Sequence, residues 1–209
     1  MEESFIYYIE SSIKENWDRP ALTDYHGINC NYKDVARKIE KLHILFEHAG
    51  IKKGDKIMKV GIIGAGTMGS GIAQAFAQTE GYEVMLCDIN ETFAANGKKK
   101  IAAGFEKRIA KGKMTQEEAD KILNKITTGV KDICGDCDLV VEAAIENMEI
   151  KKQTFKELDA ICKPSCIFAT NTSSLSITEI GSAVERHVIG MHFFNPAPVM
   201  KLVEVIAGL

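Results

Sequence analysis

The sequence predicts an α/β fold: a doubly wound parallel sheet with an inserted helical pair, preceded by a small α+β fragment. Short apolar runs alternate with helical stretches from residue 58 onward. A glycine-rich turn joins the first of these runs to the first helix, whereas residues 1–57 follow a different pattern of helix, hairpin and helix. Alternation of strands and helices is typical of a parallel sheet whose faces are covered by helices.

The first predicted strand, Lys59–Ile63, is a continuous apolar run suited to a buried parallel strand. A glycine turn follows at once, with the sequence Gly64-Ala65-Gly66-Thr67-Met68-Gly69. In a Rossmann-type unit such glycines make a tight turn, allow the backbone to approach a pyrophosphate, and pack the helix on the strand. The turn alone is weak evidence, but it lies between a predicted strand and a predicted helix, as a dinucleotide site requires.

The second predicted strand, Glu83–Cys87, ends on Asp88. A carboxylate at this point of a dinucleotide-binding unit accepts hydrogen bonds from the ribose hydroxyls of NAD and repels the additional phosphate of NADP. The alternative is a solvated aspartate that merely closes a strand. Together with the glycine turn, Asp88 predicts NAD as the cofactor.

A helical pair is predicted between Thr92 and Ile126, broken near Lys111-Gly112-Lys113 and restarted by Thr115-Gln116-Glu117-Glu118, a capping-box pattern. The alternation then continues to the end of the chain. We predict strands at residues 139–141, 166–169 and 187–191, and a helix at residues 150–161.

Residues 1–57 predict a helix over 5–17, a hairpin whose strands are 21–24 and 28–32, and a helix that ends at Gly50. Arg19-Pro20-Ala21-Leu22, Tyr32-Lys33-Asp34-Val35-Ala36 and the run from Gly50 to Ile57 resemble the extreme N-terminus of AMP-forming acyl-CoA synthetases. That family's phosphate loop and adenylate motifs do not occur here, so ligase activity is not supported. Met58 looks like the initiator of a second gene, and we place the domain boundary there, giving domains 1–57 and 58–209.

The composition is that of a globular protein, with 209 residues, 45% hydrophobic and 26% charged side chains, and a net charge of −3. The charges are interspersed, which argues against a nucleic-acid partner. Neither a secretory signal nor an apolar run of roughly 18 residues occurs, so we expect a cytoplasmic protein outside the membrane. The six cysteines are expected to be reduced thiols, and Cys134-Gly-Asp-Cys137 lacks the further ligands of a metal site, so we predict no metal.

Polar side chains gather in three segments near the ends of the later strands: 171–175, 190–196 and 200–206. Ligands of a doubly wound sheet bind outside the carboxyl ends of its strands, so these segments are placed to face a nicotinamide. A single histidine in an apolar segment is usually a core residue. His192, however, is preceded by a hydroxyl cluster and followed by the carboxylate of Glu204.

Several motifs together resemble 3-hydroxyacyl-CoA dehydrogenases, and most closely the bacterial 3-hydroxybutyryl-CoA subgroup: Gly64–Gly69, Glu142-Ala-Ala-Ile-Glu146-Asn147, Asn171-Thr-Ser-Ser-Leu175, His192-Phe-Phe-Asn-Pro196 and Lys201-Leu-Val-Glu-Val205. The resemblance implies that His192 exchanges the proton of the substrate's 3-hydroxyl, that Glu204 orients the imidazole, and that Ser173 binds the substrate oxygen. It also implies that Glu146, Lys151 and Asn195 lie along the cofactor, with Asn195 near both ligands.

The same resemblance implies an acyl-CoA substrate of short chain length, in butanoate or fatty-acid metabolism, and places Lys111 near the coenzyme A phosphates. A solvated helix face is the alternative for the lysines between Lys98 and Lys113. The family also has a helical C-terminal domain that forms most of its dimer interface. We expect that domain to be absent here and turnover to be impaired. The alternative functions are a non-catalytic NAD-binding module and, from residues 1–57, a fragment of an acyl-CoA ligase.

Overall fold

The computed structural model describes residues 13–23, 29–33, 36–37 and 59–208, and the chain divides into two units, Met1–Lys53 and Gly54–Leu209. In the first unit, β1 (Pro20–Thr23) pairs antiparallel with β2 (Asn29–Asn31), which confirms the predicted hairpin. Residues 13–15, 32–33 and 36–37 are helical. Residues 16–18 form a turn, so the first helix ends at residue 15 and not at residue 17. Residues 5–12, most of the second predicted helix and the hairpin turn lie outside the described residues.

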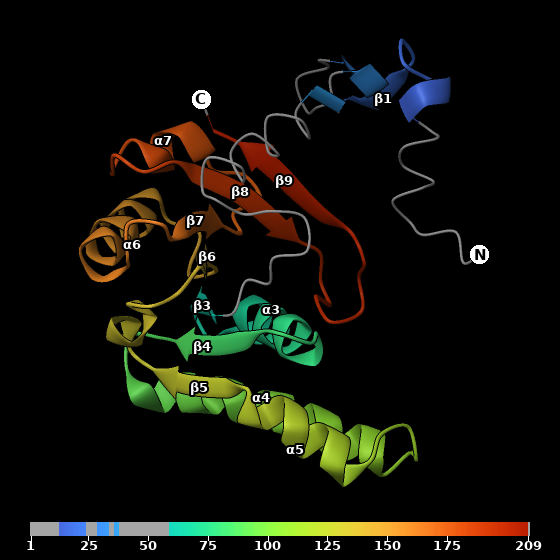
Figure 1. Cartoon of the computed structure of the whole chain (residues 1–209), viewed down its shortest axis with the longest axis vertical. Coiled ribbons are helices and arrows are strands. Elements are labelled where there is room, and N and C mark those ends of the chain that lie inside the picture. Colours follow the sequence, from blue (N-terminus) through green and yellow to red (C-terminus); the bar gives the residue numbers. More distant parts are fainter. Residues whose placement is uncertain (1–12, 24–28, 34–35, 38–58, 209) are drawn as a thin grey trace. The chain divides into compact units, whose positions relative to one another are not determined.

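The second unit is built on a seven-stranded sheet with the order β5-β4-β3-β6-β7-β8-β9 (Figure 1). Every neighbouring pair is parallel except β8 and β9, which are antiparallel. The strands are β3 (Lys59–Ile63), β4 (Glu83–Cys87), β5 (Ile126–Gly129), β6 (Leu139–Glu142), β7 (Ile167–Thr170), β8 (Val188–Phe193) and β9 (Val203–Ala207). The doubly wound α/β sheet predicted from the sequence is therefore confirmed, with an antiparallel strand added at one edge.

Helices cover both faces of this sheet, and in Figure 1 α6 and α7 lie to its left while α3 lies to its right. The helices are α3 (Thr67–Gln78), α4 (Glu91–Ile109), α5 (Gln116–Asn124), α6 (Met148–Ile161), α7 (Ile177–Gly181) and the 3₁₀ helix η1 (Lys131–Cys134). Alternate strand residues enter opposite cores: Val60 and Ile62 pack with the residues of α3 and α4, whereas Ile63 packs with Phe155 of α6. The two-residue period of a strand thus divides the apolar residues between two helical layers.

The inserted helical pair is confirmed as α4 and α5. Thr115 caps α5: its hydroxyl accepts from the Glu118 amide at 3.2 Å, and the Glu118 carboxylate accepts from the Thr115 amide at 2.8 Å. This is the predicted capping box. The hydrogen bond from the Thr115 amide, followed by interaction with the Thr115 hydroxyl, lowers the pKa of the Glu118 carboxyl.

Four elements of this unit were not predicted: β5, η1, α7 and β9. η1 is a single 3₁₀ segment of four residues. β5 has the short sequence Ile-Thr-Thr-Gly, and α7 has only one turn and a half, so neither offers a periodic pattern long enough to identify. β9 alternates between half-buried and exposed residues. Its strand conformation depends on pairing with β8, which no local pattern reveals.

Five cysteines of the second unit, Cys87, Cys134, Cys137, Cys162 and Cys166, are buried free thiols. A hydrogen bond to Cys134 and burial raise the pKa of Cys137 far above its ordinary value. Among the described residues, no group of histidine, cysteine and carboxylate side chains is arranged to hold a metal ion. No helix in this part of the chain is long and apolar enough to cross a bilayer.

Candidate active site

The glycine turn between β3 and α3 is shaped by backbone contacts. Gly64 adopts a φ of 101°, a conformation that favours glycine, and its amide donates to the Cys87 carbonyl at 2.8 Å. A Cβ on Gly69 would lie 1.7 Å from the Gly64 carbonyl oxygen, so this position admits no side chain. A Cβ on Gly66 would meet nothing within 4 Å, which leaves open space beside the N-terminus of α3. The turn therefore forms a cradle suited to a pyrophosphate.

Asp88 follows β4 and faces the glycine turn. Its Oδ2 accepts from the Ala65 amide at 2.7 Å, and its Oδ1 accepts from the Ile89 amide at 2.7 Å. A cavity of about 560 Å³ opens beside it, lined by Ala65, Gly66, Asp88, Phe93, Asn96 and Lys100. The carboxylate thus fastens the turn to β4 and also borders this cavity. Lys100 in this cavity was not predicted as a site residue.

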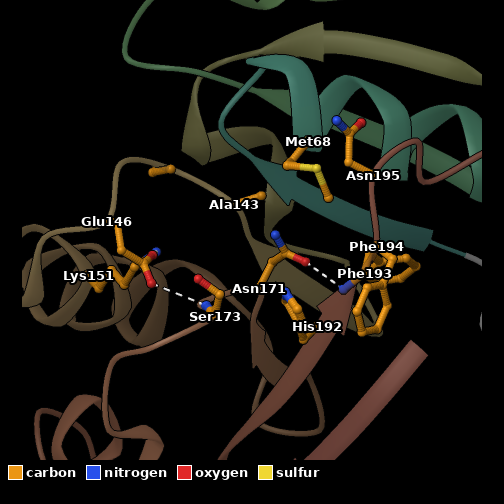
Figure 2. A pocket seen from close by; sticks show the side chains of 11 residues that line it. Met68, Ala143, Glu146, Lys151, Asn171, Ser173, His192, Phe193, Phe194 and Asn195 are labelled. Carbon is orange, nitrogen blue, oxygen red and sulfur yellow. Dashed lines mark hydrogen bonds and ion pairs between the residues drawn. The ribbon is translucent and has the colours of Figure 1, made fainter. Parts of the chain in front are cut away.

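A second pocket, of about 330 Å³, lies at the carboxyl ends of the central strands (Figure 2). Its walls come from α3 and from the segments after β6, β7 and β8: Met68, Ala143, Ala144, Glu146, Lys151, Asn171, Ser173, His192, Phe193, Phe194 and Asn195. The predicted residues His192, Ser173, Asn195, Glu146 and Lys151 are therefore brought together in one pocket, although three separate segments supply them.

His192 and Glu204 form a pair because β8 and β9 run antiparallel. The register places these two residues opposite each other, and Nδ1 of His192 lies 2.8 Å from Oε2 of Glu204. The His192 ring also packs against Phe194, with 4.9 Å between ring centroids. When Nδ1 carries the proton and donates to Glu204, Nε2 is left as an acceptor. This arrangement can take a proton from a hydroxyl group in the pocket.

A charged network lies along one wall of the pocket. The Lys151 ammonium is 2.9 Å from both carboxylate oxygens of Glu142 and 3.4 Å from Oε2 of Glu146. The other oxygen of Glu146 accepts hydrogen bonds from the Thr172 hydroxyl, from the Ser173 amide at 3.2 Å and from the Ser174 hydroxyl at 3.2 Å. Figure 2 shows the bond between Glu146 and the Ser173 backbone. This network fixes the segment that carries Ser173.

Asn171 is a pocket residue to which the sequence assigned no role. Its side-chain oxygen accepts from the Phe193 amide at 2.8 Å, so it connects the segment after β7 to the end of β8, beside His192. Glu142 was also missed. Both lie inside motifs identified in the sequence, but their spacing alone does not distinguish them from their neighbours.

Comparisons with known proteins were consistent with this geometry. The family described as 3-hydroxyacyl-CoA dehydrogenase, NAD binding domain, matches residues 59–209. The chain belongs to this family. A 3-hydroxybutyryl-CoA dehydrogenase of Clostridioides difficile is 48% identical over 155 residues, which are 72% of this chain and 54% of the relative. A probable 3-hydroxybutyryl-CoA dehydrogenase of Bacillus subtilis is 46% identical over 157 residues, 74% of this chain and 54% of the relative.

Solved dehydrogenases show the same fold. The crystal structure of (S)-3-hydroxybutyryl-CoA dehydrogenase from Ralstonia eutropha aligns with a TM-score of 0.70 and 42% identity, covering 74% of this chain and 55% of that one. The chain thus spans about half the length of the relatives it matches.

The NAD implied by this family suits the residues present. The open face of Gly66 and the N-terminus of α3 accommodate a pyrophosphate, and Asp88 borders the adjoining cavity. The pocket around His192 lies further along the same edge of the sheet, next to Met68 of α3. Lys111 lies on an exposed turn after α4 and lines neither pocket, so its contact with coenzyme A remains a prediction.

Proposed function

We propose that this chain supplies the cofactor-binding and proton-transfer half of an NAD-dependent oxidoreductase that interconverts a short-chain (S)-3-hydroxyacyl-CoA and the 3-oxoacyl-CoA. The 3-hydroxybutyryl-CoA and acetoacetyl-CoA pair is the proposed substrate, because the relatives named above carry that activity in their names. The observation that carries the proposal is the His192–Glu204 pair, 2.8 Å apart, beside a pocket next to the dinucleotide cradle.

In the proposed reaction, His192 acts as the general base for oxidation and as the general acid for reduction. The Glu204 carboxylate accepts the Nδ1 proton, keeps Nε2 free to bind the 3-hydroxyl, and stabilises the imidazolium once that proton has moved. Ser173 and Asn195 line the same pocket, and we assign Ser173 to the substrate oxygen and Asn195 to both ligands. Bound NAD supplies the hydride acceptor.

The remaining assignments are part of the same proposal. Glu146 and Lys151 border the nicotinamide end of the cofactor, and Lys111 contacts the phosphates of coenzyme A. A cytoplasmic location, a homo-oligomeric assembly and the division into domains 1–57 and 58–209 stay predictions. So does the resemblance of residues 1–57 to an acyl-CoA synthetase, which receives no support from a family match that begins at residue 59.

The test is oxidation of NADH driven by acetoacetyl-CoA. We measure it for the chain alone and for a fusion in which the remaining sequence of the Clostridioides difficile relative follows residue 209. In the fusion, His192→Ala should lower kcat by about a hundredfold or more, the range for a positioned acid–base group, and Glu204→Gln should have a smaller effect. The dissociation constant for NADH should change by less than about twofold, because the pyrophosphate cradle is intact.

Near-normal turnover by the His192→Ala fusion would remove the proton-transfer assignment. NADH binding without turnover, in both the chain and the fusion, would instead favour the non-catalytic NAD-binding module.

A further inference from the structure

Two carboxylates share one ammonium group at the wall of the His192 pocket. Lys151, whose side chain is 1% exposed, contacts Glu142 through two 2.9 Å hydrogen bonds and Glu146 through a 3.4 Å ion pair. Glu142 is fully buried, and it also accepts from the Thr170 hydroxyl at 2.6 Å and the Ala144 amide at 2.7 Å. Glu142 thus accepts four hydrogen bonds, two of them from Lys151. Glu142 therefore neutralises Lys151 from behind the pocket.

Glu146 is the member of this network that faces the pocket, with 40% of its side chain exposed. Burial acts to raise the pKa of Glu146, but the hydrogen bond from Thr172 and the charge of Lys151 outweigh it and lower that pKa. Glu146 is therefore ionised at neutral pH. Because Glu142 already compensates Lys151, the three groups sum to one negative charge.

The other charged groups around the pocket do not cancel this charge. Of the residues that line it, Lys151 is the only lysine or arginine, and His192 is the only other residue with a basic side chain. Glu204 sits behind His192, so that pair is negative when the imidazole is neutral and neutral when it is protonated. The pocket is consequently negative in either protonation state of His192.

We propose that Glu142 is a positioning residue which sets the charge of this pocket and so makes the chain bind oxidised NAD more tightly, relative to NADH, than a neutral pocket would. This inference rests on the proposed function, which places the nicotinamide in the pocket. The oxidised ring carries a positive charge that the reduced ring lacks, while the rest of the two cofactors is the same. A change in pocket charge therefore acts on the ratio of their affinities, whereas a loss of shape weakens both.

The experiment measures dissociation constants of the whole chain for NAD and for NADH at one pH, by calorimetry and by NADH fluorescence. Glu142→Gln keeps the size of the side chain but leaves Lys151 paired with Glu146 alone, so the network becomes neutral. The ratio of the NAD dissociation constant to the NADH dissociation constant should rise by about tenfold, the effect of one charge roughly 12 Å away at an effective dielectric constant of about 20. Glu142→Asp keeps the charge and should keep the wild-type ratio, even where both affinities fall.

Glu149→Gln is the control, because it removes a carboxylate from α6, the helix that carries Lys151, at a side chain that is 85% exposed, and it should leave the ratio unchanged. Glu146→Gln removes the same charge at a half-exposed position, and should raise the ratio even where Glu142→Gln fails to fold. An unchanged ratio in Glu146→Gln, or in folded Glu142→Gln, would overturn the inference. Failure of the unmodified chain to bind either cofactor would count against the proposed function instead.

Discussion

The edge of the sheet that faces the proposed cofactor site has two halves, and they are built in different ways. Around β3 and β4, the site is made largely by the backbone: a glycine with a φ of 101°, a second glycine in contact with the first, and amides that donate to Asp88. Around β6 to β9, it is made by side chains that hold one another, from Glu142 through Lys151 and Glu146 to the Ser173 segment, and from Glu204 to His192.

This difference determines what each half tolerates. A site built from backbone atoms is disrupted when a substitution adds a side-chain atom where two backbone segments are in contact, but it depends on few side chains. A side-chain network is sensitive to the loss of a single hydroxyl or charge, because a buried polar group without its partner is costly. We therefore expect the first half to respond to volume and the second to hydrogen bonding and charge.

The largest effect is expected at Gly69. Gly69→Ala would place a Cβ 1.7 Å from the Gly64 carbonyl oxygen, so the turn must open and we expect a loss of about 3 kcal/mol or more in the free energy of unfolding. Gly66→Ala meets no neighbouring atom and should unfold like the wild type, yet weaken NADH binding by about tenfold or more because the Cβ enters the pyrophosphate space. Urea unfolding and NADH titration measure the two effects. If Gly69→Ala and Gly66→Ala changed the stability and the NADH affinity to the same extent, the two glycines would not have the separate roles assigned to them.

In the side-chain half, Thr170→Val should lower the free energy of unfolding by about 1.5–3 kcal/mol. The substitution keeps the shape of the side chain but removes the hydroxyl that donates to fully buried Glu142 at 2.6 Å. Thr127→Val on β5, at an exposed position, is the control and should change stability by less than about 0.5 kcal/mol. Equal unfolding midpoints for Thr170→Val and the wild type would mean that the Glu142 network does not depend on this bond.

A smaller effect is expected at Asp88. We predict that the chain binds NADH more tightly than NADPH. Asp88→Asn should lower the ratio of the NADPH dissociation constant to the NADH dissociation constant by about tenfold, because the amide does not repel a phosphate. Asparagine still offers an oxygen to the Ala65 amide, which keeps the turn attached to β4. Lys100 lines the same cavity and can bind the additional phosphate of NADPH once the Asp88 carboxylate has been removed. Equal constants for NADH and NADPH in the unmodified chain would contradict this assignment.

The smallest predicted effect uses two glycines of α4 that differ only in their surroundings. Gly104 is exposed and a Cβ there would meet nothing within 4 Å, so Gly104→Ala should stabilise the chain by about 0.5–1 kcal/mol through helix propensity. Gly97→Ala should destabilise it, because its Cβ would lie 2.7 Å from the Ala65 Cβ at the start of the cofactor turn. Stabilisation by both substitutions would show that the contact between α4 and the turn is loose.

The sequence predicted the backbone half better than the side-chain half, for a physical reason. β3 and β4 are found at their observed bounds, because each is a continuous apolar run ended by a glycine or an aspartate. The glycine turn is likewise encoded by neighbouring residues. Glu142 gave no such signal: it ends an apolar run, and its burial is explained by partners from other elements, Lys151 on α6 and Thr170 on β7. The role of β9 depends in the same way on a partner strand.

Glu204 reaches His192 only while β9 is paired with β8, and β9 is the last strand in the sheet order. Strands at the margin of a sheet open more readily than central ones, through local unfolding that leaves the remaining structure folded. Each opening event separates the carboxylate from the imidazole while the dinucleotide cradle remains intact. The fraction of molecules with an oriented base is therefore governed by a local opening equilibrium, which hydrogen exchange at the amides of Val203–Ala207 would report independently of cofactor affinity.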